Sequence, residues 1–165
     1  MRLLRPACWL LALAIFLIAG CTHPTRATGQ TDSRNAFWSG RLALTVQSEQ
    51  PQSFAAGFEL KGHAGAGELA LFTPLGSTLA VLAWTPDSAT LQANGETRGF
   101  DSLDALASHV TGTAIPVAAL FDWLAGTPST VPGWQADLSQ LGSGRLVARR
   151  SDPPPAAELR LAFER

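Results

Sequence analysis

Apolar and polar residues alternate along several stretches of the chain, which is the pattern of a β-strand with one buried face. The alternation is clearest over Ser53–Lys61, where every second residue is apolar: Phe54, Ala56, Phe58 and Leu60. Similar runs predict strands at 41–46, 68–72, 79–84, 88–93 and 97–100. Turn signals separate them, and Asn94-Gly95 is a strong hairpin signal. This half of the chain therefore predicts an antiparallel meander that is curved or closed.

The spacing then changes to that of helices. Asp101 or Ser102 can cap a first helix that ends near Gly112, with Leu103, Leu106 and Val110 on one face. Pro116 suits the first turn of a second helix that ends at Gly126, with an apolar face formed by Val117, Leu120, Phe121 and Leu124. Three more strands are expected at 134–139, 145–150 and 158–164. The pattern predicts an α+β fold in which helices lie over a curved antiparallel sheet. It leaves open whether they cover a cavity or a filled core.

The stretch Leu69–Trp84 contains two apolar runs that flank the segment Thr73–Thr78. Pro74 fixes its own φ and Gly76 can adopt positive φ, so this segment is expected to be a hairpin loop. Leu75 is a large apolar residue in the middle of that loop. It either folds back to cover the end of the sheet or projects as an apolar finger that enters lipid. The candidate membrane-insertion loop is therefore Pro74, Leu75 and Gly76.

The first residues have the pattern of an export signal. Arg2 and Arg5 precede an apolar run from Pro6 to Gly20, which is too short to span a bilayer. The run ends in Ile18-Ala19-Gly20-Cys21, which resembles the lipobox of bacterial lipoproteins. That resemblance implies that residues 1–20 are a signal peptide and that Cys21 becomes the lipidated N-terminus. Residues 21–35 are polar and predict a flexible tether, followed by one domain over 36–165.

Removal of the signal peptide changes the charge balance. Arg2 and Arg5 are lost from 12 basic residues while all 13 acidic ones remain, so the mature chain has a net charge of about −3 with neutral histidines. Along the sequence, basic residues are adjacent only at Arg149-Arg150, so nucleic acid is not an expected partner. Of the two cysteines, Cys8 leaves with the signal and Cys21 carries lipid. No disulfide is expected, and packing must hold the fold.

The usual signatures of catalysis are missing from the sequence. It contains no Gly-x-Ser-x-Gly elbow, no Cys/His metal spacing and no Gly-x-x-x-x-Gly-Lys-[Ser/Thr] nucleotide loop. Ser77 with His63 is the one hydrolytic pair that can be imagined, and it is the weakest alternative. The chain is therefore not expected to be an enzyme or to bind a metal or a cofactor.

Five segments in order resemble the LolB family, the outer-membrane receptor of the lipoprotein-localisation pathway. They are Trp38–Leu44, Thr73–Thr78, Val110–Val117, Phe121–Gly126 and Gly133-Trp134. The resemblance implies an incomplete β-barrel, two to three helices over an apolar cavity, and a protruding loop. In many Gram-negative bacteria, an Asp directly after the lipidated Cys resembles a signal that retains a lipoprotein in the inner membrane. Thr22 at that position favours the outer membrane.

The resemblance also implies a function. A monomer would accept triacylated lipoproteins from the soluble periplasmic carrier LolA and insert them into the inner leaflet of the outer membrane. By alternation and helical spacing, the side chains expected to line the acyl-chain cavity are Phe54, Phe58, Leu60, Leu69, Leu71, Leu79, Val81, Leu120, Phe121 and Leu124. Two alternatives remain: an anchored binding protein for another apolar ligand, and a structural or assembly lipoprotein.

Overall fold

A computed structural model of the protein describes residues 36–111 and 115–164. The predicted signal peptide 1–20, the predicted lipidation site Cys21 and the predicted tether 21–35 lie outside these described residues. Within them, the strands are β1 (Ala36–Gln47), β2 (Gln52–His63), β3 (Ala66–Phe72), β4 (Thr78–Thr85), β5 (Ser88–Ala93), β6 (Glu96–Phe100), β7 (Trp134–Asp137), β8 (Arg145–Arg150) and β9 (Ala156–Glu164). The helices are α2 (Leu103–Thr111) and α3 (Val117–Leu124), with a 3₁₀ turn, η2, at Leu141–Ser143. No helix among the described residues is long and apolar enough to cross a bilayer.

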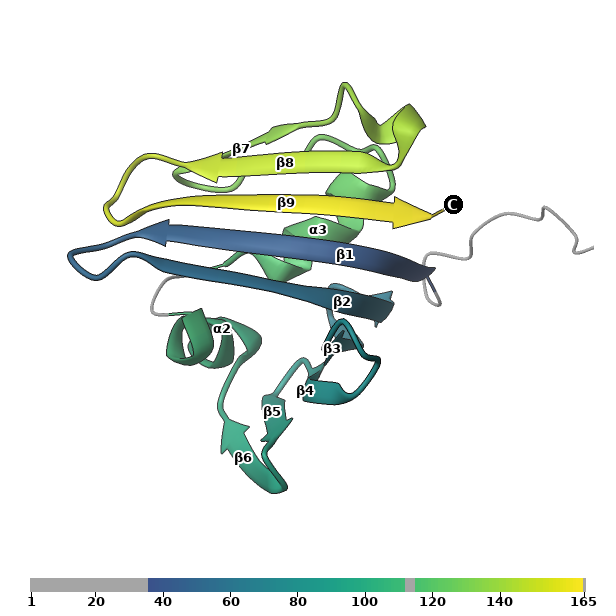
Figure 1. Ribbon diagram of the computed structural model, residues 1–165, viewed down its shortest axis with the longest axis vertical. Coiled ribbons are helices and arrows are strands. Elements are labelled where there is room, and N and C mark those ends of the chain that lie inside the picture. Colours follow the sequence, from purple (N-terminus) through teal and green to yellow (C-terminus); the bar gives the residue numbers. More distant parts are fainter. Residues whose placement is uncertain (1–35, 112–114, 165) are drawn as a thin grey trace, which may run out of the picture. The chain divides into compact units, whose positions relative to one another are not determined.

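The strands form one antiparallel, curved sheet in the order β6-β5-β4-β3-β2-β1-β9-β8-β7 (Figure 1). Strand β1 lies in the middle and pairs with both β2 and β9. The close approach of β9 requires Gly40, because a Cβ at that position would collide with the carbonyl oxygen of Ala162. Strands β6 and β7 form the two edges and do not pair with each other, so the sheet does not close. The predicted α+β fold with an incomplete barrel is confirmed.

One face of the sheet, called here the inner face, packs against the helices. Phe121 of α3 makes edge-to-face contacts with Trp38 of β1 and Trp84 of β4, at centroid distances of 5.8 and 6.0 Å. Helix α3 therefore packs against strands on both sides of β2, and α2 lies against β5 and β6. The alternation predicted for β2 holds on this face, since Phe58 and Leu60 are almost fully buried. The opposite face is called here the outer face.

The pairing of β3 with β4 corrects one part of the predicted cavity. Leu69 pairs with Leu82 and Leu71 with Ala80, whereas Val81 pairs with Ala70 on the outer face. The register then shifts between Leu71 and Phe72, and Leu79 at this irregularity is 37% exposed. The expectation that Val81 faces inward with Leu69 and Leu71 is therefore wrong, whereas the pairing gives Leu79 no partner that would assign it to a face. Residues 79–84 are apolar at both odd and even positions, so alternation could not decide which face is buried.

The sheet also has an opening in its side. Strand β3 pairs only with the second half of β2, from Gly57 to His63. The first part of β2, Gln52–Ala56, pairs with β1 on one side only. The chain leaves β3 at Phe72 through the β3–β4 loop and returns in β4. The inner face is therefore reachable beside β2, next to the β3–β4 loop.

Candidate functional site

Most of the predicted cavity residues come together on the inner face. Seven of them are 8% exposed or less and belong to one hydrophobic cluster: Phe58, Leu60, Leu69, Leu71, Leu120, Phe121 and Leu124. Phe54 shares the inner face of β2 but is 41% exposed, because it lies in the part of β2 that β3 does not reach. The seven buried side chains pack against one another and against the helices. Their role in holding acyl chains stays a prediction.

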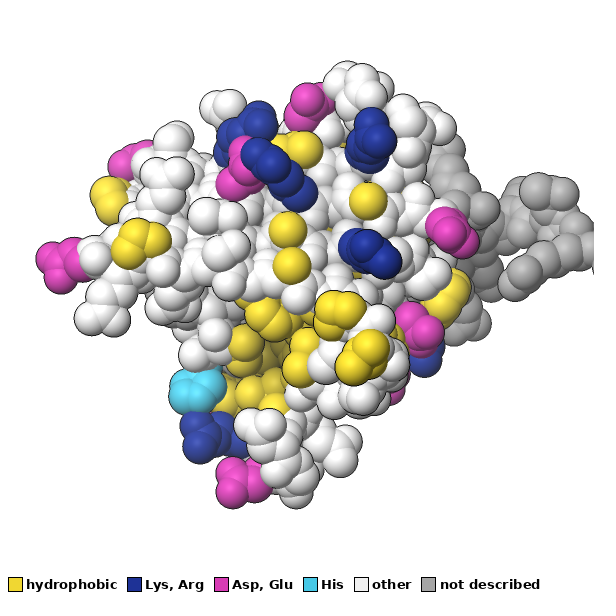
Figure 2. Space-filling model, in the orientation of Figure 1, with side chains coloured by type: hydrophobic (Ala, Val, Ile, Leu, Met, Phe, Trp, Pro, Cys, Tyr) yellow, Lys and Arg dark blue, Asp and Glu magenta, His cyan; other side chains and the backbone are white. Residues whose placement is uncertain are grey.

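Figure 2 shows an apolar recess at the side opening, between α2 and the strands β3 to β6. Four apolar residues of the surrounding elements are only partly buried: Ala80 of β4, Leu91 of β5, Phe100 of β6 and Leu103 of α2. Phe54 lies on the β2 side, and Val110 of α2 is 43% exposed. Apolar surface that water can reach inside a concave site is typical of a ligand-binding site. This recess and the inner face behind it form the candidate site.

Helix α2 covers part of the recess and contacts the edge strand through polar and aromatic groups. Nη1 of Arg98 on β6 lies 2.8 Å from Nε2 of His109 on α2, which accepts the hydrogen bond when that nitrogen is unprotonated. The rings of Phe100 and His109 are 5.2 Å apart. Leu106 and Ala107 are the buried residues of α2. Because α3 buries six of its eight residues and α2 only two of nine, we expect α2 to be displaced more easily than α3.

The β3–β4 loop has the turn structure that the sequence predicts. The amide of Gly76 donates to the carbonyl of Thr73 at 2.9 Å, with Pro74 in the second position of the turn. Gly76 has φ +85°, and the amide of Thr73 donates to the carbonyl of Ser77 at 2.8 Å. Leu75 exposes 95% of its surface. It does not fold back onto the sheet, so the first of the two alternatives for this residue is excluded.

The same loop lies beside the outer face. Gly76 borders a shallow hollow of about 410 Å³ together with Ser39, Gly57 and Phe72. These three residues are outer-face positions, because the pairing places Gly57 opposite Phe72 and Ser39 opposite Glu59. The loop therefore stands where the outer face meets the side opening, and Leu75 is exposed at its tip.

The structure separates the imagined hydrolytic pair. His63 ends β2 and pairs with Ala66, while Ser77 lies in the loop beyond the other end of β3. Strand β3 has seven residues, which corresponds to roughly 20 Å at ~3.3 Å per residue. The Nδ1 atom of His63 instead accepts a hydrogen bond from the amide of Gly65 at 3.1 Å. Ser77 and His63 cannot act together.

Comparison with known proteins decides the family. The family described as "Outer membrane lipoprotein LolB" matches residues 37–153. The chain belongs to the LolB family. It is similar to the outer-membrane lipoprotein LolB of Bordetella petrii, with 33% identity over 93% of this chain and 90% of the relative. The corresponding protein of Bordetella pertussis is 31% identical over 96% and 94% of the two chains.

A third relative is the LolB of Cupriavidus pinatubonensis, with 32% identity over 84% of this chain and 69% of that protein. The matched family names an outer-membrane lipoprotein, which agrees with the lipobox resemblance at Cys21. The protein is thus a lipid-anchored protein of the outer membrane. The predicted family and location are confirmed.

Two features of the site could not be read from the sequence. The side opening depends on where β3 stops pairing with β2, and no residue of β2 signals this. The second feature is a group of arginines on the outer face of β1, β8 and β9, which are far apart in the sequence. Strand alternation assigns each arginine to a face, but only the pairing register unites them.

Proposed function

We propose that this protein takes triacylated lipoproteins from the soluble periplasmic carrier LolA and inserts them into the outer membrane. The acyl chains enter through the side opening and lie against the inner face. Phe54 stands at the entrance, and Phe58, Leu60, Leu69, Leu71, Leu120, Phe121 and Leu124 form the apolar lining. Val81 is not part of this lining, since it lies on the outer face, and Leu79 is left out because it is 37% exposed at the register shift. The role is one of binding and transfer, without a chemical reaction.

One observation carries the proposal: an apolar inner face that opens at the side, directly beside a loop whose leucine is 95% exposed. A leucine that exposes 95% of its surface contributes nothing to the packing of the domain. Beside an apolar recess on a membrane-anchored protein, it provides a route from the recess into lipid. This arrangement favours delivery to a bilayer over storage of another apolar ligand.

Behind the side opening, the seven buried lining residues pack against one another and against the helices, so loading requires movement. The inner side chains pack against α3, and α2 lies over the recess. We infer that acyl chains displace α2, the less buried helix, and take the place of the contacts it makes. Burial of one long acyl chain contributes on the order of 10 kcal/mol at ~0.8 kcal/mol per CH₂, which exceeds the cost of moving a short helix.

The direction of transfer follows from relative burial alone. The sequence holds no nucleotide-binding loop, so cargo moves toward the site where its acyl chains are best buried. A carrier with a weaker site releases cargo to this protein, and the bilayer receives it last. The lipid anchor keeps the recess near that final acceptor.

A transfer assay with a matched pair of variants tests the proposal. Phe54 on the inner face and Phe37 on the outer face are both partly exposed phenylalanines of neighbouring strands. We expect Phe54→Glu to lower the amount of lipoprotein taken from loaded LolA by roughly ten- to hundredfold. The reason is that an apolar contact of about 1.5–3 kcal/mol is replaced by a charge. Phe37→Glu should transfer normally. Equal transfer by both variants, or cargo that stays on LolA with excess wild-type protein, would contradict the proposal.

A further inference from the structure

Arginines gather on the outer face across three adjacent strands. The pairing places Arg145 of β8, Ala162 of β9 and Arg41 of β1 side by side in one row. Arg160 of β9 lies opposite Ala43, and Arg149 of β8 lies opposite Glu158. Neighbouring strands are about 4.8 Å apart, so Arg41 and Arg145, which flank Ala162 in one row, lie roughly 10 Å apart across the sheet. The arginine face is defined here as Arg41, Arg145, Arg149 and Arg160.

This face keeps a net positive charge when its carboxylates are counted, because the four arginines outnumber Glu158 and Glu164 of β9 and Asp137 of β7, which the register places on the same face. The carboxylate of Glu158 bridges Arg149 and Arg160, with N–O distances of 2.6 Å to each. The hydrogen bond from Arg149, together with the charge of Arg160, lowers the pKa of Glu158, so this carboxylate is ionised at neutral pH. Arg41 and Arg145 are exposed and make no ion pair with any other described residue. The surface is basic although the mature chain is acidic overall.

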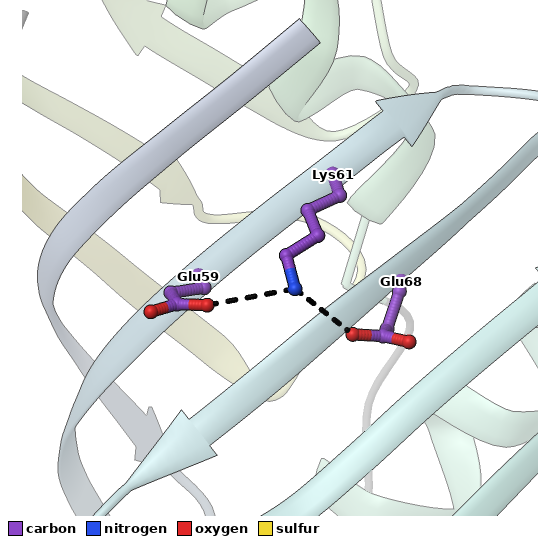
Figure 3. A network of polar contacts seen from close by, with 3 residues as sticks. All are labelled: Glu59, Lys61 and Glu68. Atoms are coloured by element: carbon purple, nitrogen blue, oxygen red, sulfur yellow. Dashed lines mark hydrogen bonds and ion pairs between the residues drawn. The ribbon is translucent and has the colours of Figure 1, made fainter. Parts of the chain in front are cut away.

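Another basic residue of the outer face has a different environment. Lys61 of β2 lies between two carboxylates, with Nζ 3.6 Å from Glu59 and 3.5 Å from Glu68 (Figure 3). The local charge around Lys61 is therefore negative. The positive surface is confined to β1, β8 and β9, which Figure 2 shows as a group of basic side chains on the facing side of the sheet.

The arginine face is continuous with the apolar loop. The row that contains Arg145, Ala162 and Arg41 continues through Gly57 of β2 to Phe72, the last residue of β3. The loop with Leu75 begins at the next residue, and its Gly76 borders the hollow beside Gly57. A second cleft of about 520 Å³ is lined by Arg149, Arg160, Glu158, Ala43 and Thr45, among others. Exposed apolar and cationic groups thus lie along one side of the molecule.

We propose that the arginine face docks on anionic phospholipid headgroups of the membrane that holds the anchor. The guanidinium groups bind headgroup phosphates, and Leu75 enters the acyl layer beside them. Helix α3 lies on the inner side of the sheet, so this orientation leaves α3 turned away from the bilayer. The proposal rests on the proposed delivery of cargo to the bilayer, because it names the surface that meets the membrane in that step.

A membrane fits these features better than an acidic protein does. The chain is anchored to a membrane, which raises the local concentration of phosphate groups around it. The apolar tip of Leu75 borders the same face, and an apolar tip beside cations is typical of surfaces that bind an interface of lipid and water. Binding to an acidic protein would use the arginines but not the apolar side chain of Leu75.

The test measures which side of the full-length, lipidated protein faces the bilayer in vesicles. A spin label at Ser53→Cys reports on the outer face, because Ser53 is exposed and pairs with Thr45 in the row of Glu158 and Arg149. A label at Asp122→Cys on α3 reports on the other side. Access of each label to a water-soluble nickel chelate is measured in phosphatidylethanolamine vesicles with and without phosphatidylglycerol. We expect phosphatidylglycerol to screen the Ser53 label and leave the Asp122 label exposed.

Matched variants identify the charges responsible. Arg41→Gln with Arg145→Gln should lower the ratio of docked to undocked protein about 25-fold, since each basic residue near an anionic surface contributes about fivefold. Lys61→Gln removes one charge from the same face and should leave the ratio unchanged.

The proposal is overturned if the Ser53 label stays exposed with phosphatidylglycerol, or if the double variant docks like the wild type. It is also overturned if only addition of LolA screens the label. Cargo transfer is measured in parallel: transfer without screening overturns this inference and leaves the proposed function intact.

Discussion

The residues around Leu75 predict its local structure, whereas those around Leu79 do not predict which face of the sheet it occupies. Pro74 and Gly76 define the turn, and the turn holds Leu75 outward at 95% exposure. The loop could therefore be predicted, but the direction of the side chain depends on hydrogen bonds that only the folded loop has. Leu79 lies in a run that is apolar at every position, so the sequence contains no signal for its face. The position of Leu79 in the sheet depends on the register shift between Leu71 and Phe72.

Leu75 provides the prediction at this scale. Leu75→Glu should leave the free energy of unfolding within about 0.5 kcal/mol of wild type, because the side chain packs against nothing that folding buries. It should slow delivery of cargo into vesicles, so that cargo-loaded protein accumulates. The reason is that moving the leucine side chain from water into the membrane interface is favourable by ~1.5–3 kcal/mol, and a carboxylate does not have this gain. Delivery rate and melting temperature are the measurements. Leu75→Phe is the control and should retain most of the delivery. Normal delivery by Leu75→Glu would exclude the insertion role.

The order of strands and helices could be predicted from the sequence, whereas their contacts could not. Period-2 alternation in β2 and helical spacing at Leu103, Leu106 and Val110 identify those elements locally. The side opening arises because β3 pairs with only part of β2, and this is a property of two strands together. The same holds for the row that joins Arg41 to Arg145. Pairing register is non-local, so one strand's sequence does not contain it.

Helix α2 gives the prediction at the scale of elements. Arg98→Cys and His109→Cys, joined by a short bismaleimide, should hold α2 against β6, because the native side chains already meet at 2.8 Å. If acyl chains displace α2, the cross-linked protein should lose most of its uptake of cargo from LolA. The double variant without reagent serves as the control and should take up cargo normally. Undiminished uptake after complete cross-linking would mean that α2 does not move during loading.

At the scale of the whole molecule, anchor and domain have separate tasks. In the proposed function, the lipid on Cys21 holds the protein at the membrane, and the domain predicted over 36–165 holds the cargo. The described residues of the inner face are contributed by strands and helices between 36 and 164. The basic and apolar groups of the outer face then orient a domain that the anchor has already brought close.

Cys21→Ala tests this division. We expect the variant to incorporate no palmitate and to remain unprocessed, because the cleavage site precedes the lipidated cysteine. Metabolic labelling with radioactive palmitate is the measurement. The domain exported behind a different signal peptide should still take cargo from LolA, since the inner face is intact. Palmitate incorporation into Cys21→Ala would contradict the assignment of the anchor.

The central claim is that the acyl chains of the cargo bind the inner face, and native mass spectrometry tests it most directly. The mature protein is mixed, without detergent, either with LolA that carries a triacylated lipoprotein or with LolA and the same lipoprotein lacking its acyl chains. The account predicts a one-to-one complex of this protein with the triacylated cargo and none with the deacylated form. Phe54→Glu should reduce that complex and Phe37→Glu should not. Equal binding of both forms of the cargo, or no complex with the triacylated one, would contradict the account.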